Sequence, residues 1–276
     1  MANVIVRDMD AASAYFVSTC SHVRESAEAD ASGERRLAWL RPRLEQGLRV
    51  KVAYVGGEPV GQLYVMPIEL CPWGPAGRGL MALPCLFVLR TAQGRGVGRA
   101  LVAAAEEEVR RQGFSGLVTQ AYYHDCWFMP ASFFEHLGFA VAARRGPEAL
   151  LWKPFAPAAE PPAFASPFFA YEPGPHHVAV DLFYNTFCQT SEIEAQRVRE
   201  VCAEFADDVL LREHRVDGQE ALLRHGRGRG IFVNGREIGW GYEAPKEGVR
   251  EAIHEALQRP RSRLRKVPRA SAGDDK

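Results

Sequence analysis

The sequence predicts an α/β protein built from two successive modules. Segments with strand periodicity and segments with helix periodicity alternate along most of the 276 residues. A stretch rich in proline and alanine, residues 154–175, interrupts this alternation and divides it into two unequal parts. In the first part, a glycine-rich turn at residues 93–98 joins a strand-like run to a helix-like run, and we take this turn as its organising element.

The composition is that of a globular protein and excludes some classes of partner. The 34 Lys and Arg residues balance the 34 Asp and Glu residues, so the overall charge favours neither nucleic acid nor an anionic membrane. No apolar run approaches the ~20 residues of a membrane span, and the first residues lack a signal-peptide pattern. The six cysteines are scattered without a Cys-x-x-Cys pair, as is typical of reduced thiols. We expect a cytoplasmic protein that binds neither nucleic acid nor membrane, with homo-oligomer formation left open.

The first module is expected to run strand, two helices, three strands, helix, strand, helix and two strands. Asp10 can cap the first helix, Gly47 can end the second, and Gly56-Gly57 between two β-rich runs predicts a hairpin. The expected strands are 4–6, 49–55, 59–65, 80–89, 116–121, 140–144 and 149–153, and the expected helices are 10–23, 35–46, 98–112 and 132–137.

The turn Gln93-Gly94-Arg95-Gly96-Val97-Gly98-Arg99 predicts an anion-binding site. Free N–H groups at the start of a helix, together with the helix dipole, favour phosphate. Glycines allow close approach of the backbone to a ligand, and Arg95 and Arg99 add positive charge. The turn lacks the Lys-Ser/Thr pair of a nucleotide P-loop, and the next strand does not end in the acid of a dinucleotide site.

The turn resembles the Gln/Arg-x-x-Gly-x-Gly/Ala signature of the GNAT acyltransferase superfamily, matched here by Gln93, Gly96 and Gly98. About 40 residues downstream, Phe133-Phe134-Glu135-His136-Leu137-Gly138-Phe139 is similar to the "FYEKLGF" element of that family. The resemblance implies a GNAT fold, with a mixed, mostly antiparallel central sheet in which two strands splay apart. It further implies acetyl-CoA as co-substrate and a small-molecule amine as acceptor.

By this resemblance, residues Gln93 to Arg99 hold the pyrophosphate of acetyl-CoA. Backbone groups of Leu86, Phe87 and Val88 would pair with the pantetheine arm, and strand 116–121 would be the splayed partner. Acceptor specificity would lie in the stretches 27–33 and 71–79 and in the second module.

The sequence departs from the family pattern at the usual proton donor. Phe134 occupies the position of the family's tyrosine, and Trp127 that of its frequent asparagine. The candidate replacements follow the splayed strand: Tyr122, Tyr123, His124 and Asp125. A phenol can protonate the CoA thiolate, and His124 or Asp125 can relay a proton from the amine. Release of the thiolate without an acid, and binding of CoA without catalysis, are the alternatives.

A metal site is a further alternative, which we do not expect. Cys85, His124 and Cys126 could converge near the strand ends, with Cys71 in the neighbouring loop. Their spacing matches no zinc pattern, and buried thiols are more often structural.

The second module, residues 176–258, is expected to contain strands at 177–185, 209–215 and in the hairpin 230–238, and helices at 192–205, 219–225 and 245–257. Its order resembles a thioredoxin-like fold, and its combination with the first module resembles the YoaP-type acetyltransferases. Cys188 lies where that fold places its redox motif, at a helix start that favours a thiolate. Ser191 replaces the second cysteine, and Gly230 stands where a cis-proline is usual. Cys188 is therefore either a thiol or soft-metal contact, or part of an inert, substrate-shaping unit.

The expected domains are a GNAT unit at 1–155, a linker at 156–175, the thioredoxin-like unit at 176–258 and a flexible tail at 259–276. The aromatic residues of the linker are too numerous for a freely solvated segment, so we expect it to lie against one unit. Three functions follow: an acetyl-CoA-dependent N-acyltransferase, a non-catalytic acyl-CoA-binding protein, or a thiol module acting through Cys188.

Overall fold

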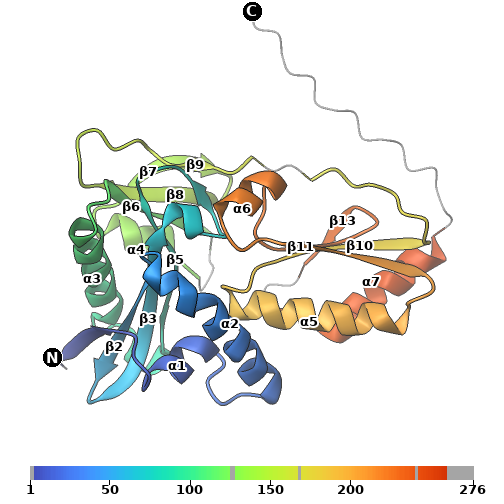
Figure 1. The fold of residues 1–276 in the computed structure, drawn as a ribbon, viewed down its shortest axis with the longest axis horizontal. Coiled ribbons are helices and arrows are strands. Elements are labelled where there is room, and N and C mark those ends of the chain that lie inside the picture. The colour runs from blue at the N-terminus through green and yellow to red at the C-terminus, as the bar shows by residue number, and fades with distance from the viewer. Residues whose placement is uncertain (1–2, 125–127, 167–168, 240–241, 260–276) are drawn as a thin grey trace, which may run out of the picture.

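A computed structural model describes residues 3–124, 128–166, 169–239 and 242–259 of the chain. Two modules lie side by side, and helix α5 extends from their junction along the second one (Figure 1). Within the described ranges, no helix is long and apolar enough to cross a membrane.

The first module is built on a seven-stranded sheet in the order β1-β2-β3-β5-β6-β8-β7. Only β5 and β6 are parallel, and the other neighbouring pairs are antiparallel. The strands are β1 (Val4–Asp8), β2 (Arg49–Val55), β3 (Glu58–Pro67), β5 (Met81–Val88), β6 (Gly116–Tyr122), β7 (Ala140–Arg145) and β8 (Glu148–Pro154). The expected mixed, mostly antiparallel sheet is thus confirmed.

Helices cover both faces of this sheet. Alternate residues of a strand point to opposite faces, so Leu63 and Val65 of β3 meet α3 (Val97–Arg111) and α4 (Ala131–Glu135). Tyr64 and Met66 lie on the other face with α1 (Ala14–Thr19) and α2 (Ala27–Glu45). Two apolar cores, one on each side of the sheet, therefore fix the strand ends.

The second helix begins earlier than the expected residues 35–46, so that residues 27–33 are helical. These residues form the first turns of α2 and not a loop, because the Ser26 hydroxyl caps the helix by accepting from the N–H of Ala29 at 3.1 Å. The first expected helix is also shorter, since α1 spans only Ala14–Thr19. The helix after the glycine turn is confirmed to within one residue at each end.

The second module has its own sheet and core. The four-stranded sheet has the order β11-β10-β12-β13, with β10 and β11 parallel and the rest antiparallel. Helices α5 and α7 share one apolar core with this sheet. The elements are β10 (Val178–Tyr184), α5 (Gln189–Glu204), β11 (Val209–Arg215), α6 (Gln219–His225), β12 (Gly230–Val233), β13 (Arg236–Ile238) and α7 (Lys246–Gln258).

The segment between the modules packs against both of them. Its strand β9 (Ala163–Phe164) pairs with β4 (Pro75–Ala76) of the first module. Further on, the Phe169 ring lies 5.1 Å from the Phe183 ring and 4.6 Å from the Phe232 ring, on the sheet of the second module. The expectation that this aromatic-rich segment lies against a folded unit is confirmed.

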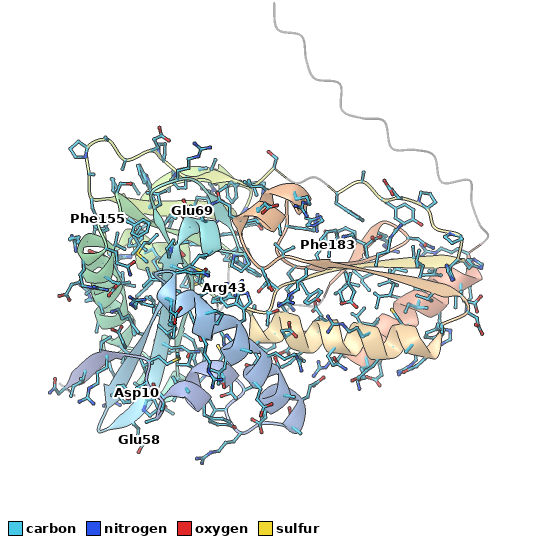
Figure 2. All side chains as sticks on the ribbon, viewed as in Figure 1. Asp10, Arg43, Glu58, Glu69, Phe155 and Phe183 are labelled. Carbon is cyan, nitrogen blue, oxygen red and sulfur yellow. The ribbon has the colours of Figure 1, made fainter. Side chains whose placement is uncertain are left out.

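Apolar and charged contacts join the two modules. Phe187, at the end of β10, is buried in the core formed by α1, α2 and the first sheet. Arg35 and Glu28 of α2 pair with Glu192 and Arg197 of α5 at 2.8 and 2.7 Å. Figure 2 places Arg43 at the same junction, where its guanidinium donates to the Asp217 carbonyl. The modules therefore share one continuous interface.

A buried histidine adds a pH-sensitive pair to this junction. His22 Nδ1 lies 2.7 Å from Oε2 of Glu25. Its Nε2 lies 2.8 Å from Oε1 of Glu243 in the second module, and this second contact is an ion pair without hydrogen-bond geometry. Burial opposes the charge of the imidazole, but the two carboxylates outweigh burial and raise the pKa of His22 to about 9.

We predict that His22→Gln destabilises the protein most at mildly acidic pH. Because folding raises this pKa, the stabilisation is complete below the unfolded-state pKa of ~6.5 and is lost as pH rises through about 9. The free energy of unfolding should fall by about 1–3 kcal/mol near pH 6 and by little at pH 10. Melting temperatures between pH 6 and 10 measure this difference, with exposed His136→Gln as the control. A deficit that stays constant over this range would contradict the assignment.

Candidate functional site

The glycine turn lies between β5 and α3 with its backbone amides open. Gly94 and Gly96 have φ values of +71° and +82°, in the left-handed region that favours glycine. Gly96 is the N-cap of α3 and has no side chain to cap it, and the first helical hydrogen bond runs from Ala100 N to Gly96 O at 3.0 Å. The amides that begin the helix therefore have no intrahelical partner and suit an anion.

Space above this turn is open. A Cβ atom at Gly94 or Gly96 would meet nothing within 4 Å, whereas one at Gly98 would lie 3.1 Å from Cζ of Phe133. Gln93 holds the turn on the preceding strand, because its side-chain amide donates to the carbonyl of Val88 at 3.1 Å. Arg95 and Arg99 are exposed beside the turn. The predicted anion site thus has both room and positive charge.

Strands β5 and β6 diverge before they reach this turn. They pair only at Met81 with Leu117 and at Ala82 with Val118, while Leu86, Phe87 and Val88 stay paired with β3 on the other edge. The predicted splay of these two strands is confirmed. The separation begins at Leu83, whose carbonyl accepts a hydrogen bond from the Thr119 hydroxyl at 2.7 Å.

A pocket of about 220 Å³ lies at this divergence and is completed by the second module. Its walls come from both modules: the end of α1, the middle of α2, the splayed strands and the loops near them in the first, and the loop and helix start after β10 with Arg229 and Tyr242 in the second. The lining residues are Cys20, Ser21, Arg36, Trp73, Pro84, Cys85, Leu86, Phe87, Tyr122, His124, Phe128, Phe187, Cys188, Gln189, Thr190, Arg229 and Tyr242.

Of the four predicted catalytic residues, the pocket contains two. Tyr122 and His124 line it with ring centroids 5.4 Å apart, and the Tyr122 hydroxyl accepts from the Gln120 amide at 3.1 Å. Tyr123, the first residue after β6, is not among the residues that line the pocket. Its hydroxyl donates to the Glu135 carboxylate at 2.5 Å. Asp125 lies outside the described residues, as do Cys126 and Trp127.

The position of the family's tyrosine is part of the core. Phe134 is fully buried, in edge-on contact with the rings of Phe133 and Phe139 at 5.0 and 5.5 Å. It supplies packing and no proton. Any proton donor at this site must therefore come from another element.

Arg36 is a site residue that the sequence did not reveal. It lies on α2 and is 1% exposed, and the sequence pattern of that helix does not distinguish it from a surface arginine. One Nη donates to the carbonyl of Val17 at 3.2 Å, and the guanidinium lies over the ring of Tyr64 at 4.6 Å. Its Nε has no hydrogen-bond partner in the part of the chain that the structure describes. Its electrostatic neighbours are the phenol of Tyr64 and three thiols rather than a carboxylate.

These three thiols come from distant parts of the sequence and line one pocket: Cys20 after α1, Cys85 on β5 and Cys188 before α5. A hydrogen bond from the Cys85 thiol and the charge of Arg36 outweigh burial and lower the pKa of Cys20 to about 5. The same hydrogen bond, together with burial, raises the pKa of Cys85 well above its usual value. Of these two thiols, Cys20 is therefore the one whose charged form its surroundings favour.

Cys188 occupies its predicted place at the start of a helix. It is the N-cap residue of α5, and its Sγ lies 3.0 Å from the hydroxyl of Thr190. Arg229 contacts the same hydroxyl at 3.1 Å and pairs with Glu194 at 2.7 Å. The nearby Arg224 and Arg227 have carboxylate partners of their own, Glu220 and Glu237.

No group of three His, Cys, Asp or Glu side chains within the described ranges is arranged to hold a metal ion. Of the residues named for a metal site, Cys126 lies outside those ranges.

Comparison with known proteins assigns the central part of the first module. Residues 46–141 match the model of the acetyltransferase (GNAT) domain. The match covers less than half of the chain, and it shows a similarity of this stretch to GNAT acetyltransferase domains. The matched stretch contains the glycine turn, both splayed strands and Phe134, while Cys20, Arg36 and the second module lie outside the match.

Solved structures of several GNAT proteins are similar to this chain. A GNAT-family acetyltransferase from Desulfovibrio desulfuricans is 22% identical, with 56% of this chain and 100% of that chain covered at a TM-score of 0.45. The PaiA N-acetyltransferase from Thermoplasma acidophilum in complex with coenzyme A is 13% identical, with 55% of this chain and 99% of that chain covered at a TM-score of 0.43. A Brucella melitensis GNAT acetyltransferase in complex with acetyl-CoA is 18% identical, with 58% of this chain and 94% of that chain covered at a TM-score of 0.40. A comparison with curated proteins finds no match.

We predict that iodoacetamide alkylates Cys20 first. Burial raises the pKa of Cys71 and of Cys202 to about 12, so at pH 7 these two thiols are protonated while Cys20 is a thiolate. The Cys20 peptide should react at least ~10-fold faster than the other two in the folded protein. Quantitative peptide mass spectrometry over a time course measures the three rates in one sample. Equal rates, or earlier labelling of Cys71, would contradict the assigned thiolate.

Proposed function

We propose that the protein is an acetyl-CoA-dependent N-acyltransferase that acetylates an amine of a small molecule. The observation that carries this proposal is the open glycine turn at the start of α3, placed at the end of a splayed strand inside a matched GNAT domain. The amides from Gly94 to Arg99 would receive the diphosphate of the coenzyme, with Arg95 and Arg99 beside it.

The acyl end of the coenzyme would lie between the diverging strands. Leu86, Phe87 and Val88 are half-buried on β5 and use their β3-facing edge for the sheet, so the edge toward β6 is available to the pantetheine arm. Leu86 and Phe87 also line the pocket, which gives the thioester a site closed on its far side by the second module. Such a site holds the thioester and the amine at short range.

Proton transfer would fall to the two pocket residues after β6. His124 is suited to accept the proton of the attacking amine, and the phenol of Tyr122 is suited to return a proton to the coenzyme thiolate. Asp125, the next residue in the sequence, is a further candidate. Tyr123, which bonds to Glu135, is not part of this proposal.

We further propose that the second module is a thioredoxin-like unit, related to that of the YoaP-type acetyltransferases, which shapes the acceptor side. The parallel pair β10 and β11 joined through α5, followed by the antiparallel hairpin of β12 and β13, supports this fold. Phe187, Cys188 and Thr190 supply pocket walls that the first module lacks. The five cysteines that the structure describes are free thiols, as is typical of a reducing compartment, which supports a cytoplasmic location.

A non-catalytic acyl-CoA-binding protein is the second candidate, favoured by the buried Phe134. A thiol-release assay with acetyl-CoA and a broad panel of amines separates the two. Acceptor-dependent release supports the transferase, whereas tight binding of CoA with no acceptor supports the second candidate.

We predict that Gly96→Val weakens the binding of coenzyme A by roughly 10- to 100-fold, because valine is strained at φ +82° and its side chain enters the space left for the diphosphate. Isothermal titration calorimetry with coenzyme A measures the dissociation constant. Gly57→Val is the matched control, since Gly57 has a φ of +90° and open space but lies in the hairpin between β2 and β3. No binding by the unaltered protein, or unchanged binding by Gly96→Val, would overturn the proposed function.

A further inference from the structure

The pocket contains a nucleophile that direct transfer from acetyl-CoA to an amine does not use. Cys20 and Cys85 line it together, and Cys85 is followed by Leu86 and Phe87, the stretch proposed to hold the acyl end of the coenzyme. We propose that Cys20 carries the acetyl group as a covalent thioester between acetyl-CoA and the amine, an inference that rests on the proposed function.

The first support is the charge at the base of the pocket. The guanidinium of Arg36 is almost completely buried, and the groups facing it are the phenol of Tyr64 and the thiols of Cys20, Cys85 and Cys188. A buried cation is costly without an anion beside it. Its Nε–H, without a partner among the described residues, is available to an anion in the pocket. A thiolate at Cys20 would place negative charge in the same pocket as this cation.

The second support is the way the backbone presents Cys20. The residue ends α1 with φ 52° and ψ −117°, a conformation that residues other than glycine rarely adopt. Its N–H still donates to the carbonyl of Phe16 at 3.2 Å, and the next residue, Ser21, contacts the hydroxyl of Tyr242 in the second module. The strained turn is therefore held from both sides, and the side chain stays partly accessible within the pocket.

The first step is a thioester exchange. The Cys20 thiolate attacks the carbonyl carbon of acetyl-CoA, a bond from carbon to Cys20 sulfur forms, and the bond to the coenzyme sulfur breaks. Coenzyme A leaves as a thiolate, so one anionic sulfur replaces another and no proton is required. This balance suits a site in which Phe134 replaces the usual acid.

In the second step, the neutral amine attacks the acetyl-Cys20 carbonyl, and the Cys20 thiolate leaves beside Arg36. The proton released by the amine passes to the coenzyme thiolate or to solvent, with His124 at the pocket wall. The products are the acetylated amine, coenzyme A as the thiol, and the original Cys20 thiolate. Stabilisation of that thiolate by Arg36 and Cys85 makes it a good leaving group.

The experiment is to incubate the full chain with acetyl-CoA without an amine, quench in acid, and map acetylation by peptide mass spectrometry. We expect one acetyl group on Cys20, removable by neutral hydroxylamine as a thioester is. The peptides of Cys71 and Cys202 in the same digest should stay unmodified, and Cys202→Ala should keep the adduct. Addition of an accepted amine should discharge Cys20 in a single turnover.

Variants separate this role from a structural one. Cys20→Ser should lose the adduct and lower kcat/KM by roughly 100-fold or more, while the coenzyme still binds in calorimetry. Arg36→Met should slow acetylation of Cys20 more than Arg36→Lys, which keeps the positive charge. Retained binding of coenzyme A shows that each variant is folded.

Absence of acetyl-Cys20 in protein that binds acetyl-CoA overturns the inference, as does undiminished turnover by Cys20→Ser. In both cases coenzyme binding and amine acetylation leave the proposed function standing. Loss of coenzyme binding in the unaltered protein would instead overturn the proposed function itself.

Discussion

The guanidinium of Arg36 is the constraint on which the rest of the site depends. It binds the carbonyl of Val17 at the end of α1, lies over Tyr64 of the sheet, and lies 5.4 Å from the Phe187 ring of the second module. A single buried cation thus connects α1, α2, β3 and the loop after β10. Because water is largely excluded there, its charge acts on the neighbouring thiols more strongly than a surface arginine would.

The second module is part of the site and not an appendage. Phe187 packs in the core of the first module, and ion pairs between α2 and α5 hold the second module in place against it. The pocket walls after β10 exist only in this arrangement. The strand divergence and the glycine turn lie within the matched residues 46–141, while the pocket walls from α1, α2 and the second module lie beyond them.

The local features of the fold were predictable, because they follow from short stretches of sequence. Glycines at 94 and 96 require positive φ, and a strand-like run before them with a helix-like run after them placed the turn correctly. The start of α2 was missed because its Ser26 cap precedes a polar first turn without clear periodicity. Tyr122 and Tyr123 could not be separated in advance, since the choice depends on which face of β6 meets the pocket.

The convergence of three thiols and an arginine in one pocket was not predictable for a different reason. The sequence placed Cys188 at a helix start and named Cys85 only as a metal candidate, whereas Cys20 and Arg36 alone are typical of ordinary buried or helical positions. Only their convergence gives them chemical meaning.

The proline-rich segment between the modules has a consequence for how the chain can be divided. Its β9 strand completes a small sheet with β4, and Phe169 covers aromatic rings on the far side of the second sheet. Cutting the chain on either side of the segment 154–175 would expose apolar surface on one module or the other. The two modules and the segment between them therefore form the smallest unit that can be inherited or lost without exposing such surface.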